Sequence, residues 1–81
     1  MGSSYVAFWL MQGGIPVVQY TCLSDAIADA KRMGVRSVDH YYIKEIYEDT
    51  KFKMEWFFDL DGNRYETAYD AVNKAMMEET V

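Results

Sequence analysis

The chain has 81 residues, 51% of them hydrophobic and 16% aromatic, with a formal net charge of -5. A chain of this length accommodates one hydrophobic core, and its apolar content is high enough to offset the entropy cost of ordering. We therefore expect one folded domain over residues 1–81, with a disordered start at 1–4. The longest apolar run, Val6 to Met11, is too short to cross a bilayer and lacks the features of a signal peptide. Cys22 is the only cysteine, which excludes an internal disulfide and favours the cytoplasm.

Residues 5–21 predict a β-hairpin whose two strands are joined at Gly13 and Gly14. Two glycines take the positive φ angles of a two-residue turn at little steric cost. If these glycines form the whole loop, Leu10 faces Val17 across the hairpin, and both faces of the hairpin carry apolar side chains.

A helix is expected over residues 25–33, with Ser24 as its N-cap and Gly34 as the residue that ends it. Its apolar residues recur three and four positions apart, which predicts one stripe that packs on the sheet. The stripe contains Leu23, Ala26, Ile27, Ala30 and Met33.

Residues 38–48 and 52–60 predict a second hairpin. The later strand gives the clearest signal, because its apolar residues alternate with mostly charged ones, as in a half-buried strand. The earlier strand is less regular, and placing its two isoleucines on one face would require a bulge near Lys44 and Glu45.

A turn is expected at residues 61–63, followed by a helix to about Met77 that is opened by Thr67 with Asp70 as a capping pair. The stripe of this helix contains Ala68, Tyr69, Val72, Ala75 and Met76. The predicted fold is therefore an α+β domain in the order ββαββα, with a four-stranded antiparallel sheet and both helices mainly on one face.

No catalytic site is predicted, because the single histidine, His40, has no partner that would make it a triad or a metal site. Cys22 is either a small buried side chain or a thiol whose pKa is lowered by a helix N-terminus. Residues 59–63 superficially resemble a calcium loop but lack the distal glutamate, and Asp, Gly and Asn are ordinary turn formers. We therefore expect neither a metal nor a cofactor, and no enzyme activity.

The second half of the chain is acidic. Two short helices cannot cover all the aromatic rings of the predicted strands, which are Tyr5, Trp9, Tyr20, Tyr41, Tyr42, Tyr47 and Phe57. An acidic surface repels phosphate backbones but attracts a basic protein, so we expect a protein partner and no direct nucleic-acid binding. Two alternatives remain open: the acids only maintain solubility, or the sheet curls on itself or packs its outer rings together in a monomer. The predicted partner-binding residues are Glu45, Tyr47, Glu48, Asp49, Glu55, Phe57, Asp59 and Asp61.

In layout the chain resembles small phage-encoded anti-CRISPR inhibitors, through residues 5–8, residues 23–25 with 30–32, and the hairpin of residues 43–61 with its closing turn at 61–64. The resemblance implies a stoichiometric inhibitor in the host cytoplasm that blocks a basic, nucleic-acid-binding surface of a host defence complex. The alternative function is a homodimeric structural or regulatory domain whose bare sheet face pairs with a second copy.

Overall fold

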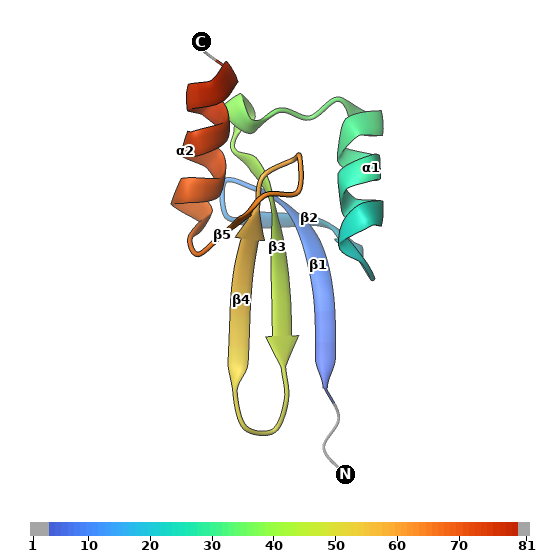
Figure 1. Ribbon diagram of the computed structural model, residues 1–81. Coiled ribbons are helices and arrows are strands. Elements are labelled where there is room, and N and C mark those ends of the chain that lie inside the picture. The colour runs from blue at the N-terminus through green and yellow to red at the C-terminus, as the bar shows by residue number, and fades with distance from the viewer. Residues whose placement is uncertain (1–3, 80–81) are drawn as a thin grey trace.

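A computed structural model describes residues 4–79, without the side chains of residues 75, 76, 78 and 79. Within this range the chain forms a five-stranded antiparallel sheet in the order β2-β1-β3-β4-β5, with two α-helices (Figure 1). The elements are β1 (Tyr5–Gln12), β2 (Ile15–Tyr20), α1 (Leu23–Met33), the 3-10 helix η1 (Ser37–Asp39), β3 (Tyr41–Glu48), β4 (Lys53–Phe58), β5 (Arg64–Tyr65) and α2 (Ala68–Glu79). The α+β class and antiparallel sheet are confirmed, but the prediction of four strands is wrong. The predicted disordered start lies, apart from residue 4, outside the described residues.

The β1–β2 hairpin turns at the two glycines, as predicted. Gly13 and Gly14 have φ angles of 57° and 88°, and the residues that flank them pair with each other. Beyond the turn the register shifts by one residue, so that Leu10 lies opposite Val18 and not opposite Val17. The prediction for Leu10 is wrong because Val17 is an extra, bulged residue that the sequence pattern does not reveal.

Helix α1 starts earlier than predicted. Cys22, not Ser24, occupies the N-cap position, and its side chain makes no capping hydrogen bond. The predicted end is confirmed, because Gly34 adopts a φ of 71° and the amide of Val35 donates to the carbonyl of Ala30 at 3.3 Å. Glycine is favoured there because a Cβ makes this left-handed conformation costly.

One face of the sheet packs against α1. Leu10 and Ile43 are fully buried there beside Phe58, and they contact Ala26 and Ala30 of the helix. Both alanines belong to the predicted apolar stripe, which is confirmed except at its last member, Met33, whose exposed fraction is 41%.

The other face packs against α2, where Met11 and Tyr42 form a second cluster with Ala71 and Val72. Side chains alternate along a strand, and residues directly opposite on antiparallel neighbours share a face. The two clusters therefore lie on opposite sides of the sheet, and the prediction that both helices cover mainly one face is wrong. The physical reason is that both faces of the central strands are apolar, so each face requires its own helix.

Strand β3 is regular, contrary to the predicted bulge. Its register with β1 and β4 is continuous, so Ile43 faces α1 while Ile46 faces the side of α2. Because each face has its own apolar contacts, the two isoleucines have no need to share one.

The start of α2 is confirmed, because the Thr67 Oγ1 accepts a hydrogen bond of 3.1 Å from the amide of Asp70. Ala68 and Val72 face the sheet as predicted. Tyr69 does not, since its exposed fraction is 76%. The side chains of Ala75 and Met76, the last members of this predicted stripe, lie outside the described residues. Neither described helix has the length and hydrophobicity that a membrane crossing needs.

The two helices flank only one end of the long central strands. At the other end β1, β3 and β4 extend past the helices, where β3 and β4 are joined by a turn and β1 begins (Figure 1). We call this part, residues 4–8, 45–48 and 53–56 with the turn at 49–52, the distal end. No described helix lies over it, and Val6, Phe52 and Met54 are exposed there.

Candidate protein-binding surface

On the side of α1, the distal end carries a row of three residues from three neighbouring strands. Val6 lies opposite Tyr47, which lies opposite Met54. The exposed fractions of Val6 and Met54 are 44% and 43%, and Phe52 beside them is 51% exposed, with its ring centre 5.6 Å from that of Tyr47. Apolar side chains that gather on a surface are a common feature of recognition sites. We call this surface, with Glu45, Phe8 and Trp56 from the next row, the distal face.

The centre of the distal face holds a carboxylate. Glu45 is on the central strand β3, directly between Phe8 of β1 and Trp56 of β4, and all three residues are half-buried. Within residues 4–79, no hydrogen bond or ion pair joins the Glu45 carboxylate to another group. The carboxylate is thus available to a cationic group, in surroundings that exclude part of the water.

The ring of Trp56 also contacts Arg64 of β5, whose guanidinium carbon is 4.3 Å from the ring centre. This distance is that of a cation–π contact. The contact orders the Trp56 ring and supplies the distal face with a positively charged border on the side of β5.

Asp49 is the first residue of the β3–β4 turn, and it contacts Tyr47 near the end of β3. The Asp49 Oδ1 accepts hydrogen bonds from the amides of Lys51 and Phe52 at 2.8 and 3.0 Å, and its Oδ2 accepts one from the Tyr47 hydroxyl at 3.1 Å. The two backbone donors are the main reason that the pKa of Asp49 is lowered, and the hydrogen bond to Asp49 raises the pKa of Tyr47. The Asp49 carboxylate therefore stabilises the turn.

The opposite side of the distal end carries paired charges. The Lys44 Nζ is 2.5 Å from the Glu55 Oε2, and this contact is the main cause of the lowered pKa of Glu55. Glu48 and Lys53 are exposed and lie opposite each other on the same side. This side is therefore nearly balanced in charge.

The remaining predicted partner-binding residues lie away from the distal end. Phe57 packs against Tyr42, with 6.1 Å between the ring centres. Asp59 is 2% exposed and accepts hydrogen bonds from its own loop, so its carboxylate cannot reach a partner. Asp61 is exposed in that loop. The predicted residues therefore fall on both sides and at both ends of the sheet and do not form one surface.

Sequence reasoning missed the apolar part of the distal face. The sequence pattern places Val6, Phe52, Met54 and Trp56 in strands and indicates no binding role for them, although the alternation in residues 52–60 puts the last three on one side. The missing information was that α1 stops short of this end.

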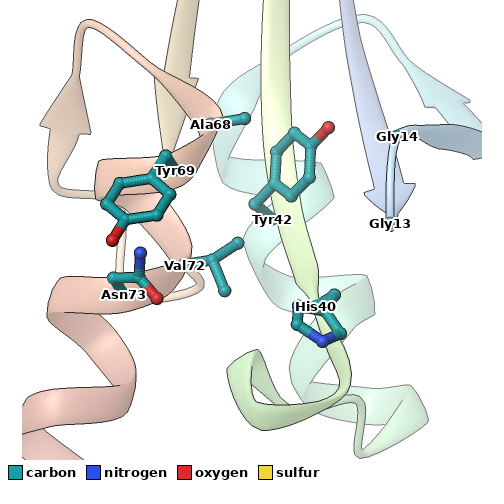
Figure 2. Close-up of a pocket in the computed structure, with 8 residues that line it drawn as sticks. All are labelled: Gly13, Gly14, His40, Tyr42, Ala68, Tyr69, Val72 and Asn73. Atoms are coloured by element: carbon teal, nitrogen blue, oxygen red, sulfur yellow. The ribbon is translucent and has the colours of Figure 1, made fainter.

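A separate hollow of about 300 Å³ lies between the β1–β2 turn and α2 (Figure 2). Gly13, Gly14 and His40 border it on one side, and α2 contributes Tyr69 and Asn73 on the other. His40 is exposed and has a φ of 66°, and its carbonyl accepts a hydrogen bond from the Gly13 amide. The hollow is lined mainly by apolar atoms, and His40 and Asn73 are among its lining residues.

Cys22 is not part of this hollow. It lies at the N-terminus of α1, half-buried, with its Sγ 3.3 Å from the Ser24 Oγ. The structure therefore does not bring Cys22 and His40 together as a nucleophile and a base.

Comparison of the chain with family models, with curated proteins and with solved structures finds no match.

Proposed function

We propose that this chain is a non-enzymatic protein-binding module whose distal face binds a basic surface of another protein. The observation that carries the proposal is Glu45, a half-buried carboxylate without a partner in the described chain, framed by Phe8 and Trp56 and bordered by the exposed apolar row. Interfaces commonly combine a central, well-packed anchor with surrounding contacts that exclude water.

An arginine or lysine of the partner fits this arrangement best. A guanidinium forms strong, often bidentate hydrogen bonds to a carboxylate and also stacks on aromatic rings, and both groups are present here. The net charge of -5 additionally attracts a basic partner before contact is made.

The resemblance in layout to anti-CRISPR inhibitors suggests the kind of partner. A phage or mobile-element inhibitor of this type occupies a basic, nucleic-acid-binding surface of a host defence complex and keeps nucleic acid away from it. The acidic composition of the chain supports such a role, because carboxylates compete for the same cationic side chains that bind phosphate.

The proposal is tested with a photo-crosslinking amino acid at Tyr47 of the distal face and, as a matched control, at Tyr69 on α2. In extract of the source cells, position 47 should give an adduct with a nucleic-acid-binding protein, and added nucleic acid should suppress it. Glu45→Gln should weaken the adduct at position 47, because the substitution removes the charge and keeps the shape.

The proposal fails if position 47 gives no adduct, if position 69 gives the same adduct equally well, or if Glu45→Gln and nucleic acid leave the adduct unchanged. Far-UV circular dichroism of each variant checks that the fold is intact. We expect an intact fold because all three substituted side chains keep contact with solvent.

A further inference from the structure

The outer edge of β4 is only partly covered by β5. Strand β5 has two residues, and they pair with Phe57 and Phe58 alone. The preceding residues Lys53, Met54 and Glu55 are exposed, and Figure 1 shows this stretch of β4 running free toward the β3–β4 turn. The described chain places no strand beside them.

Two hydrogen bonds show which backbone groups of β4 point outward. The amide of Asp59 donates toward β5, to the carbonyl of Asn63, whereas the carbonyl of Phe52 accepts on the side of β3, from the amide of Asp49. Backbone groups alternate sides along a strand. The amides and carbonyls of Lys53 and Glu55 therefore point to the free edge.

The opposite edge of the sheet is protected from pairing. Strand β2 contains Pro16, which has no amide hydrogen, and its register is broken by the bulged Val17. Both features block the addition of another strand. Strand β4 has neither, so the two edges differ in their capacity to pair.

We propose that two copies of this chain pair antiparallel along the free edges of β4, with Met54 opposite Met54 of the second copy. In this register Lys53 lies opposite Glu55 of the second copy, and the two exchange both backbone hydrogen bonds. The same pair recurs on the other side of the twofold axis. A continuous sheet then runs through both copies.

The side chains agree with this register on both faces of the sheet. The segment from Phe52 to Trp56 reads the same in either direction by chemical type: aromatic, charged, methionine, oppositely charged, aromatic. On the side of α2, Lys53 of each copy lies opposite Glu55 of the other, so both pairs join opposite charges. On the side of α1, Phe52 faces Trp56 of the second copy, next to the two methionines.

The neighbouring symmetric registers are disfavoured. Residues whose backbone groups point to the free edge must lie opposite residues of the second copy whose backbone groups do the same. A shift of the register therefore moves the partner of each residue by two positions. One such shift places Lys53 opposite Lys53 of the second copy, and the other places Glu55 opposite Glu55. Like charges directly opposite repel each other, so charge selects the register centred on Met54.

This pairing goes beyond the proposed function. It joins the distal faces of two copies side by side without covering them, because side chains stand perpendicular to the sheet. A monomer that still crosslinks a basic protein through position 47 would leave the proposed function standing and remove the pairing, so the two failures are distinguishable.

The test measures the mass of the full chain by sedimentation equilibrium over a range of concentrations. The unmodified chain should form a dimer. Lys53→Glu alone and Glu55→Lys alone should each weaken dimerisation by at least about tenfold, because each places like charges opposite one another. Lys51→Glu makes the same charge change in the turn, outside the paired residues, and should leave the dimer intact.

Mixing the two single variants gives the sharpest outcome. A Lys53→Glu chain facing a Glu55→Lys chain restores opposite charges at both pairs, so the mixture should form a heterodimer at concentrations where each variant alone dimerises weakly. A monomeric unmodified chain at all concentrations, a dimer that ignores the single substitutions, or a mixture that fails to associate would each overturn the proposal. If the edge instead receives an extended peptide of another protein, the unmodified chain stays monomeric, which also overturns it.

Discussion

The hydroxyl of Tyr65 donates a hydrogen bond of 3.0 Å to the Oδ2 of Asp59, and this contact ties β5 to the loop that precedes it. The Asp59 carboxylate also accepts hydrogen bonds from the amides of Asp61 and Asn63 and from the Asn63 Nδ2, each at 2.9 Å. A carboxylate that is 2% exposed and meets so many donors stabilises the loop.

Asp59→Ala should therefore lower the free energy of unfolding by about 1 to 3 kcal/mol, because the loop amides and the tyrosine hydroxyl lose their acceptor. Urea denaturation followed by circular dichroism measures the loss. Asp61→Ala, an exposed aspartate of the same loop, should change stability by no more than about 0.5 kcal/mol. Equal effects of the two substitutions would show that the loop does not depend on Asp59.

Ile43 is fully buried between the sheet and α1, whereas Ile15 is 68% exposed on the edge strand. Ile43→Val should cost about 0.5 to 1.5 kcal/mol of unfolding free energy, since it removes a packed methyl group from the core. The identical change Ile15→Val should be close to neutral. Chemical denaturation of both variants tests this difference, and a larger loss at Ile15 would contradict the assignment of the core.

Gly62 adopts a φ of 94°, and a Cβ there would lie 2.9 Å from the Ile27 Cδ1 on α1. Gly14 has a similar φ of 88° but open space around it. Alanine at either position should cost about 1 to 2 kcal/mol through backbone strain, with an additional loss at Gly62 from the contact. In an Ile27→Val background, which lacks the Cδ1, that additional loss should shrink. Unfolding free energies of the single and double variants give the comparison, and an unchanged loss would show that the contact does not matter.

The Tyr20 hydroxyl donates a hydrogen bond to the Asp29 Oδ2 of α1. The pKa of Tyr20 is raised to about 12, mainly by burial and next by this hydrogen bond. Between pH 10 and 12 the unfolded chain has released this proton while the folded chain retains it, so stability should fall as the pH rises through this window. Asp29→Asn should lower the pKa of Tyr20 but leave it above 10, because burial remains.

Ultraviolet absorbance at alkaline pH follows tyrosine ionisation in the chain, in Asp29→Asn and in Tyr20→Phe. The tyrosine that ionises at the highest pH should be absent in Tyr20→Phe, and its ionisation should shift to lower pH in Asp29→Asn. A tyrosine with a pKa of about 12 that persists unchanged in both variants would contradict the assignment to Tyr20.

Local chemistry allowed several elements to be predicted from the sequence. Gly13 and Gly14 form the predicted turn, Gly34 ends α1, and Thr67 caps α2. In each case the side chain, or the absence of one, acts on backbone groups only a few residues away. The distal face is only partly predictable, because charge and ring content predict a binding role for Glu45 and Tyr47 but not for Val6 and Met54.

The sequence by itself determined the α+β class, the alternation of apolar and polar residues in β4, and the positions of the turns, because these depend on neighbours along the chain. Only the tertiary structure decided that the helices cover opposite faces and that Val17 bulges to place Val18 opposite Leu10. Both outcomes depend on which apolar surface is shielded by which element. Packing between residues far apart in the sequence decides which helix covers which face. A local pattern that makes both faces apolar is therefore compatible with helices on one face or on opposite faces.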